Sequence, residues 1–327
     1  MRRRSRALAM AAAIVMCAAA MTYAQEPQEP AVVGSLPLPA PTGWFAISRT
    51  GTVAAAVCGG SKLVIWSLPG GHVERTIEFP ARNLDLFVMS DDGRSILLAD
   101  HLGKATIWDA STGTVRAELT FPRYFAAAAF SHDGTRIAIA PVHLGFQIYD
   151  VASRRKLAES RDIPGSTSGA LTFSPDDSLI ASADGDTAVR IYRTRDATVV
   201  ATNNDFLLEP LAATFSRDGK QLIAAGADKT IALLDATTGA TSRKFPAVPD
   251  PIFALGLSNN GTLLVAGTLH ADNLGAPAPI IVWDLATATT KREWTPPTPA
   301  IAGSWINDGH LLIATATRDT VQLWRVY

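Results

Sequence analysis

The sequence predicts an all-β protein, a seven-bladed β-propeller of four-stranded antiparallel blades whose ring is closed by an amino-terminal strand. Three observations carry this prediction: a sevenfold repeat of about 42 residues, a turn motif at a fixed place in each repeat, and short apolar runs on both sides of that turn. The chain has 327 residues, of which 47% are hydrophobic and 18% are charged, and this composition excludes a disordered or collagen-like protein.

The repeat is marked by an aromatic or large apolar residue that ends a short apolar run. Successive anchors of this kind are separated by 42, 41, 43, 42, 49 and 41 residues. They are Trp66, Trp108, Tyr149, Tyr192, Leu234, Trp283 and Trp324. A turn resembling Ser-x-Asp-Gly precedes each anchor, and six of the seven turn-to-anchor distances equal 15 residues. The sixth repeat has seven extra residues, which fall in the loop at His270–Pro279.

Each repeat is expected to form four strands, because the turn separates two apolar runs, a loop precedes the anchor strand and a further turn follows it. In the second repeat we predict strands at Asp85–Met89, Ser95–Ala99, Ala105–Trp108 and Val115–Leu119. Small residues on the first strands, such as Gly303, fit the crowding near a central axis. A lone four-stranded sheet has two apolar faces, so each blade must pack between two neighbours, and a ring provides this.

The strand that closes the ring is predicted at the amino-terminal end of the propeller, because the last repeat lacks a fourth strand. The segment Val32–Pro39 has the pattern and closing proline of the outermost strands at Val73–Pro80 and Val115–Pro122. We therefore expect it to pair with Val321–Trp324. Pro37 is compatible with this place, since an outermost strand needs hydrogen bonds on one side only.

Residues 1–24 are predicted to be a secretory signal peptide, followed by a short linker at 25–30 and the propeller at 31–327. Four arginines among the first six residues precede an apolar run, and small residues at Thr22 and Ala24 suit cleavage. The run has 15 residues, fewer than the roughly 20 of a membrane-spanning helix. We therefore expect a periplasmic or secreted protein, cleaved near Ala24 and without a transmembrane segment after cleavage.

Charge and cysteine content narrow the possible partners. Cleavage would leave 25 of the 29 lysine and arginine residues against 30 aspartate and glutamate residues, a net charge of −5. Such a chain lacks the basic clusters that bind phosphate, so no nucleic-acid partner is expected. Cys58 would be the remaining thiol, and we expect no internal disulfide and no cofactor.

Three segments resemble the tryptophan-aspartate (WD) repeat family of β-propellers, here in a divergent, exported, bacterial form: Thr106–Asp109, Ile281–Asp284 and Asp228–Asp235. The resemblance covers nearly all of residues 31–327. It implies that Asp186 and Asp228, at the family's structural-aspartate position, tie a turn rather than take part in chemistry.

The chain also departs from the family pattern. The Gly-His pair that opens the family's repeats is absent, and Ser67, Arg193 and Arg325 replace the aspartate that follows the anchor. The resemblance therefore does not imply the family's buried His–Asp hydrogen-bond network in this chain.

No catalytic residue and no metal site are predicted. His101, His143 and His270 fall in loops on one face, but neighbouring blades hold such loops on the order of 10 Å apart, whereas zinc needs nitrogens about 2 Å away. Asp85 is the one carboxylate on the predicted innermost strands, and we expect it to be a solvated strand-end residue. Cys58 lacks a partner at the spacing of a catalytic triad, and we expect a small, buried or half-buried residue there.

Binding is predicted on the face that carries the connections between blades. The candidate binding residues are Arg123, Tyr124, Phe206 and Glu209, because arginine and aromatic side chains dominate contact energies. An alternative for the segment Phe206–Leu208 is that it folds back onto the propeller.

The resemblance and this surface together predict a non-catalytic scaffold for an unknown protein or peptide partner. Two alternatives stay open: a propeller enzyme, such as a lactonase-like hydrolase that uses the central channel, and a carbohydrate-binding module. The fold alone does not choose among them, because one fold hosts many functions.

Overall fold

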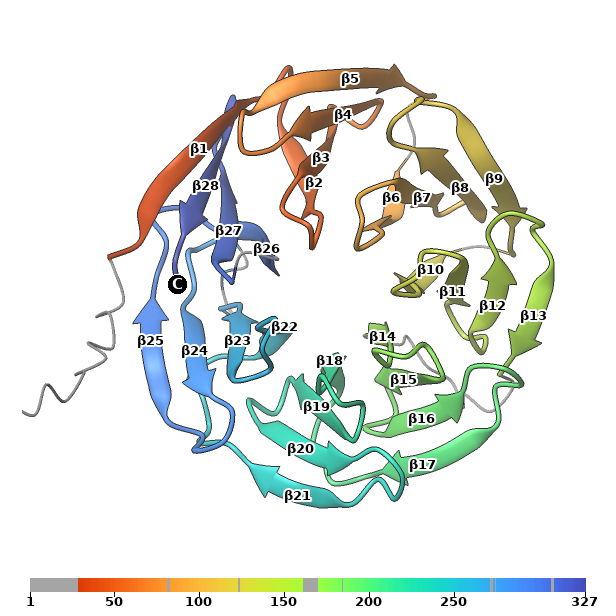
Figure 1. Ribbon diagram of the computed structural model, residues 1–327, viewed down its shortest axis with the longest axis vertical. Helices are drawn as coiled ribbons and strands as arrows, with labels where there is room; N and C mark the ends of the chain where they lie inside the picture. The colour runs from red at the N-terminus through yellow and green to blue at the C-terminus, as the bar shows by residue number, and fades with distance from the viewer. Residues whose placement is uncertain are drawn as a thin grey trace, which may run out of the picture.

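The strands form a ring of blades around a central axis (Figure 1). The computed structural model describes residues 29–80, 83–122, 124–160, 170–183, 185–270, 273, 275–306 and 309–327. In this part of the chain, 28 strands make seven four-stranded antiparallel sheets, so the predicted all-β, seven-bladed propeller is confirmed. No helix among the described residues has the length and apolar character needed to cross a bilayer. The predicted signal peptide and most of the linker lie outside the described residues.

The first four blades follow one another along the chain. Blade 1 contains β2 (Thr42–Ile47), β3 (Val53–Cys58), β4 (Lys62–Ser67) and β5 (His72–Glu78). Blade 2 contains β6 (Leu84–Met89), β7 (Ser95–Asp100), β8 (Lys104–Asp109) and β9 (Val115–Thr120). Blade 3 contains β10 (Phe125–Phe130), β11 (Arg136–Pro141), β12 (Gln147–Asp150) and β13 (Lys156–Glu159). Blade 4 contains β14 (Ala170–Phe173), β15 (Leu179–Ala183), β16 (Val189–Arg193) and β17 (Val199–Asn203).

The remaining blades complete the ring. Blade 5 contains β18 (Pro210–Phe215), β19 (Gln221–Gly226), β20 (Ile231–Asp235) and β21 (Thr241–Lys244). Blade 6 contains β22 (Ile252–Leu257), β23 (Leu263–Thr268), β24 (Ile280–Asp284) and β25 (Thr290–Trp294). Blade 7 contains β26 (Ala300–Trp305), β27 (Leu311–Ala316), β28 (Thr320–Arg325) and, from the other end of the chain, β1 (Ala31–Pro37).

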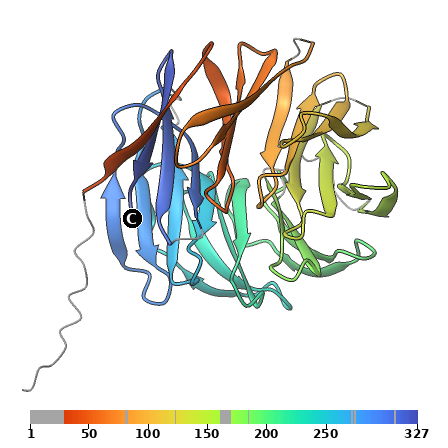
Figure 2. The ribbon, with the colours of Figure 1, turned by 45° about the horizontal axis from the view of Figure 1, so that its top comes forward.

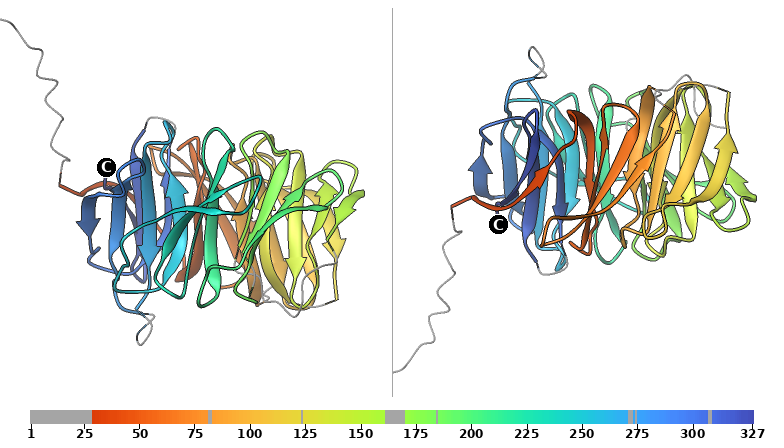
Figure 3. Two further views of the ribbon diagram at one scale, coloured as in Figure 1. Left: turned by 90° about the horizontal axis from the view of Figure 1, so that it is seen from below. Right: turned by 90° about the horizontal axis from the view of Figure 1, so that it is seen from above.

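The first strand of each blade lines the axis. Neighbouring first strands contact one another around the circle, and β2 meets β26 to complete it. Seen from the side, the blades stand next to one another in a disc (Figure 3). We call its two sides the turn face, which carries the turns within the first and last strand pairs of each blade, and the loop face. The loop face carries the loops between second and third strands and the connections between blades.

The predicted closure of the ring by the amino-terminal strand is confirmed. Strand β1 runs antiparallel to β28 on the outside of blade 7, with Val32 opposite Trp324 and Leu36 opposite Val321 (Figure 2). Pro37 lies opposite Thr320 at the edge of the sheet, where its missing N–H interrupts no second ladder. A bulge falls between Val32 and Gly34.

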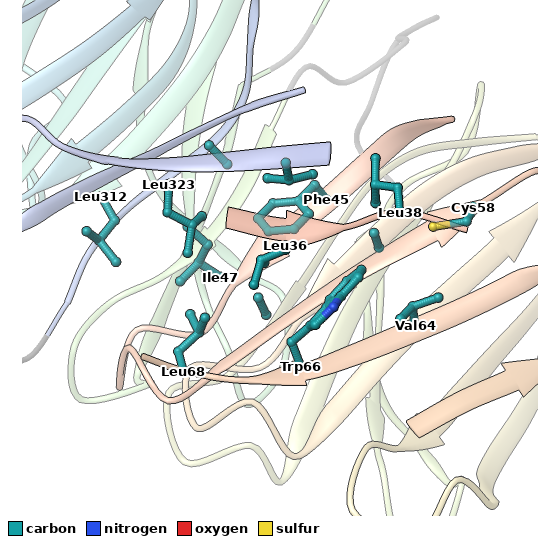
Figure 4. Close-up of a cluster of buried hydrophobic side chains, with 14 of the residues drawn as sticks. Leu36, Leu38, Phe45, Ile47, Cys58, Val64, Trp66, Leu68, Leu312 and Leu323 are labelled. Carbon is teal, nitrogen blue, oxygen red and sulfur yellow. The ribbon is translucent and has the colours of Figure 1, made fainter. Parts of the chain in front are cut away.

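The core is divided among the interfaces between blades. The described residues form seven hydrophobic clusters, each drawn from two adjacent blades, because every sheet buries apolar side chains on both faces. The cluster between blades 7 and 1 contains Leu36 from β1 and Trp66 from β4, both fully buried (Figure 4). Four of the seven anchors, at Trp66, Tyr192, Leu234 and Trp283, are at most 2% exposed.

The turn motif has a specific role for each of its positions. In blade 2, the buried Ser90 hydroxyl donates to the Asp92 carboxylate at 2.6 Å and accepts the Ser95 N–H at 2.9 Å. Asp92 in turn accepts the Arg94 N–H, and Gly93 adopts a left-handed backbone with φ of 73°. In five further turns the backbone N–H five residues on likewise donates to the hydroxyl of the first serine, at Ser48, Ser131, Ser174, Ser216 and Ser258.

Candidate interaction surface

Tyr124 stands on a rigid junction between blades 2 and 3. Its side chain is 52% exposed, and its ring lies 5.9 Å from the His101 ring. The next residue, Phe125, donates its backbone N–H to the Asp85 carboxylate at 2.9 Å, and the other oxygen of that carboxylate lies 3.8 Å from His101 Nδ1. The expectation that Asp85 is a solvated strand-end residue is therefore wrong: its side chain is 18% exposed and joins two blades.

The connection between blades 4 and 5 presents leucines rather than Phe206. Phe206 is 5% exposed and packs in the cluster between these blades, so the expectation that it faces a partner is wrong. Burying this ring removes apolar area from water and fixes the loop. Leu207 and Leu208 remain 83% and 54% exposed, and the Asp228 carboxylate accepts the Leu207 N–H at 3.1 Å. Only Phe206, at the start of the segment, folds into the propeller.

Of the two other candidate binding residues, Glu209 is among the described residues and Arg123 is not. Glu209 is exposed on the loop face, and its backbone carbonyl accepts the Ala227 N–H at 2.9 Å. Arg123 lies outside the described residues, so the prediction for it is untested. The binding roles of Arg123, Tyr124 and Glu209 stay predictions.

Exposed apolar side chains gather on the loop face. Among the described residues, large hydrophobic side chains that are well exposed occur in two places only, the loop face and the outermost strands. On the loop face they are Leu102, Tyr124, Leu144, Leu207, Leu208 and Phe253. Those on the outermost strands are the smaller valines Val32, Val33, Val73, Val115 and Val199. The described turns of the turn face carry none of them, but Val32, Val73, Val115 and Val199 lie at the turn-face ends of their strands, opposite the repeat anchors. The loop face therefore differs in carrying the exposed leucine and aromatic side chains.

The histidines of the loop face serve different structural ends. His270 is held on both ring nitrogens, with Nδ1 3.0 Å from the Asp250 carboxylate and Nε2 3.0 Å from the Pro277 carbonyl oxygen. His143, by contrast, is exposed. Across the described chain, no group of three or more His, Cys, Asp and Glu side chains is placed to hold a metal ion.

Cys58 is fully buried at the end of β3. Burial disfavours the charged thiolate and raises the pKa of this thiol to about 11, although a hydrogen bond with the backbone of Ala40 acts in the opposite direction. At neutral pH the thiol is protonated and enclosed, as a structural residue would be.

A polar belt that was not predicted from the sequence surrounds the central axis on the turn face. A cavity of about 220 Å³ opens there, lined by residues of all seven blades, including Thr172, Thr214 and Ser304. The belt comes from the second position of the turn motif, which is Pro175 in blade 4 and a polar or charged residue in the other five described turns. These residues are Arg49, Asp91, His132, Arg217 and Asn259. Their shared position in the repeat was the available signal.

Contacts within this belt join neighbouring blades. Arg49 lies 3.6 Å from the Asp91 carboxylate, and Arg217 donates to the Asn259 side-chain oxygen at 2.9 Å. His132 Nδ1 lies 3.1 Å from Asp177, whose hydrogen bond raises the pKa of His132 against the opposing effect of burial, with help from the Asp91 charge. The belt therefore links blades 1 and 2, blades 5 and 6, and blades 3 and 4.

Comparison with known proteins agrees with the geometry. The family profile described as the anaphase-promoting complex subunit 4 WD40 domain matches residues 170–260, from β14 into the loop after β22. Transducin beta-like protein 3 of Rattus norvegicus is 25% identical over 258 residues, or 74% of this chain. The chain is a WD-repeat propeller. A WD repeat-containing protein of Schistosoma mansoni, SL1-17, is 24% identical over 155 residues, or 47% of the chain.

The matches cover only part of these relatives. The WD-repeat propeller described here aligns with 31% of the rat protein and 51% of the Schistosoma protein. A third relative, the F-box-like/WD repeat-containing protein TBL1X of Mus musculus, is 27% identical over 130 residues, which are 38% of this chain and 24% of that protein.

Two aspartates at the family's structural position in this WD-repeat propeller do tie turns. Asp228 accepts the Thr230 N–H at 3.1 Å and its hydroxyl at 2.7 Å. Asp186 accepts two hydrogen bonds from the Arg190 guanidinium, at 3.0 and 2.6 Å, and its pKa is lowered chiefly by that contact. Asp228 also holds the loop of Leu207, so a family feature positions the exposed leucines.

Proposed function

We propose that this propeller is a non-catalytic interaction scaffold that recognises a protein or peptide partner with its loop face. The observation that carries the proposal is the gathering of exposed leucine and aromatic side chains on that face, of which the described turns of the turn face carry none. Apolar and aromatic side chains on a rigid frame supply contact area at small entropic cost. The matching profile is named after a subunit of a complex, which supports the same class of function.

The frame under these side chains supports recognition without rearrangement. Tyr124 is held by the Asp85 and His101 junction, while Leu207 is held by buried Phe206 and by Asp228. Because Tyr124 and Leu207 are both held in place before binding, the loops lose little conformational entropy when a partner binds. Glu209 lies beside the leucines and adds a negative charge to the rim of the surface, where it acts on specificity more than on affinity.

The test uses purified protein as bait in an envelope extract, followed by affinity measurement with the captured partner. The double variant Tyr124→Ala/Leu207→Ser should weaken binding at least tenfold, since each of these two side chains should contribute about 1–3 kcal/mol of binding free energy. Its melting temperature should match the wild type, because both side chains are largely exposed.

The matched control is Lys220→Ser, which changes an exposed residue of the turn face. It should leave the affinity unchanged. If instead Lys220→Ser weakens binding while the double variant binds normally, the interaction uses the turn face and the proposal is wrong. A stoichiometric metal in the purified protein would favour the hydrolase alternative.

We also propose that the protein is exported, on the evidence of the basic and apolar segments that precede residue 25. Mass spectrometry of the periplasmic or extracellular protein should give a mass that begins at Gln25. A secreted chain that retains Met1 would contradict cleavage, and a chain confined to the cytoplasm would contradict export.

A further inference from the structure

An apolar cleft separates blades 6 and 7. A cavity of about 210 Å³ lies between β22 and β23 on one side and β26 and β27 on the other. It extends from Phe253 and Pro299 at the loop face to Trp305 and Leu311 toward the turn face. Of the described residues that line it, none is charged. The site is distinct from the exposed leucines of blades 4 and 5.

The cleft exists because small residues stand on facing strands. By strand register, blade 6 has Ala254 and Gly256 where blade 2 has Leu86 and Val88. Gly256 has no left-handed backbone, so its small size rather than its conformation matters. Among the described residues, the cluster between blades 6 and 7 has seven buried hydrophobic members, whereas that between blades 7 and 1 has fifteen. The interface between blades 6 and 7 therefore buries fewer hydrophobic residues than the other interface of blade 7.

One polar group in the wall lacks a partner. Trp305 is 4% exposed, and its indole N–H makes no hydrogen bond. Its Nε1 lies 3.9 Å from the point where a Cβ on Gly256 would stand, so this edge of the ring faces the glycine that widens the cleft. The indole N–H groups of Trp66 and Trp108 also lack partners, but those rings do not line this cavity. A buried donor without an acceptor costs free energy, which a ligand oxygen would recover.

We propose that this cleft binds a small, uncharged and mainly apolar molecule that carries one hydrogen-bond acceptor, such as a carbonyl oxygen. The apolar walls bind its body, and the Trp305 N–H donates to its oxygen. A charged ligand is disfavoured, because the described residues that line the cleft offer no opposite charge to offset desolvation. The Thr268 hydroxyl is already used, since it donates to the Pro279 carbonyl at 2.7 Å.

The probe is Nile red, an uncharged apolar dye with a carbonyl group whose emission shifts to the blue in apolar surroundings. The wild type should show one saturable site. Ala254→Leu extends a side chain from the cleft wall and should weaken dye binding at least tenfold. Trp305→Phe keeps an aromatic ring but removes the donor and should weaken binding three- to tenfold. Melting temperatures confirm that each variant is folded.

The control Leu207→Ser changes the exposed apolar patch of the loop face and should leave dye binding unchanged. The proposal is overturned if the wild type shows no saturable binding, if folded Ala254→Leu binds the dye as tightly as the wild type, or if Leu207→Ser abolishes binding. If Ala254→Leu weakens protein-partner binding while the dye shows no saturable site, the cleft receives a partner side chain instead. That result would overturn this proposal and leave the loop-face function standing.

Discussion

Asp177 occupies the fourth position of its turn motif. The other six turns have a glycine there, also with a left-handed backbone. The φ of Asp177 is 57°, a conformation that costs an aspartate more than a glycine. In return, its carboxylate accepts the backbone N–H groups of His132 and Asp133 at 2.9 and 3.2 Å and contacts the His132 ring. One residue thus exchanges local strain for a tie between blades 3 and 4.

Asp177→Gly should lower the free energy of unfolding by about 1–3 kcal/mol. The relieved backbone strain is of order 1 kcal/mol, whereas hydrogen bonds to a charged group contribute about 1.5–3 kcal/mol each and the carboxylate is nearly buried. Urea denaturation of both proteins measures the difference. Equal or greater stability of the variant would show that strain outweighs the hydrogen bonds.

His132 should make stability depend on pH. Its pKa is raised in the folded protein, first by the Asp177 hydrogen bond and then by the Asp91 charge, while burial and Arg49 act in the opposite direction. A raised folded pKa gives a stabilising contribution that is complete below the unfolded value of about 6.5 and is lost as pH rises through the folded value.

The prediction compares wild type with His132→Gln, which does not titrate. From about pH 6 to pH 8, the melting temperature of the wild type should fall relative to that of the variant. Thermal unfolding across this range measures the difference between the two curves. Parallel curves would mean that His132 gains no proton affinity on folding.

At the scale of single elements, β1 is the strand that joins the two ends of the ring. It supplies fully buried Leu36 to the cluster between blades 7 and 1 (Figure 4), while its Val33 is 45% exposed. Pairing with β28 also covers a ladder of backbone groups that would otherwise lie at an open edge.

Leu36→Ala should cost about 2–5 kcal/mol of unfolding free energy, because a buried leucine is replaced by a cavity. The control Val33→Ala, on the exposed side of the strand, should change it by less than about 0.5 kcal/mol. Deletion of residues 31–39 should lower the melting temperature more than either, whereas deletion of 25–30 should not lower it. Equal melting temperatures for the two deletions would contradict the role of β1.

Strands could be predicted from the sequence because their signal repeats. The anchors and turns recur at nearly constant spacing, and Val32–Pro39 has the pattern of an outermost strand, so even the closing partner was accessible. Contacts between blades were not, since Asp85 bonds Phe125 across 40 residues and His132 bonds Asp177 across 45. Such contacts depend on how two blades face each other. The burial of Phe206 beside exposed Leu207 was missed for the same reason.

At the scale of the whole molecule, the ring is held by two kinds of link. Blades 1 to 6 are joined to their successors by the chain, whereas blades 7 and 1 are joined through β1, which pairs in blade 7 and continues into β2 of blade 1. To open that interface, the protein must break the β1–β28 ladder as well as the hydrophobic cluster. Strand β1 therefore adds a covalent connection between blades 7 and 1 to the packing of their sheets.

A circular permutant separates the effect of the β1–β28 strand pairing from that of the covalent connection between β1 and blade 1. It begins at Pro41 and carries residues 31–40 after Tyr327 through a short Gly/Ser linker, so blade 7 becomes continuous and blade 1 is no longer tethered to it. Because β1 and β28 are antiparallel with Ala31 opposite Arg325, a short linker can join them.

The permutant should fold, since all strand pairs are retained. Its unfolding free energy should be a few kcal/mol lower than that of the wild type, because the contact between blades 7 and 1 is then made without a covalent tether. It should still exceed that of the chain lacking 31–39, which loses both pairing and tether. Denaturant unfolding of the three proteins gives the order, and a permutant as stable as the wild type would show that β1 acts only as the fourth strand of blade 7.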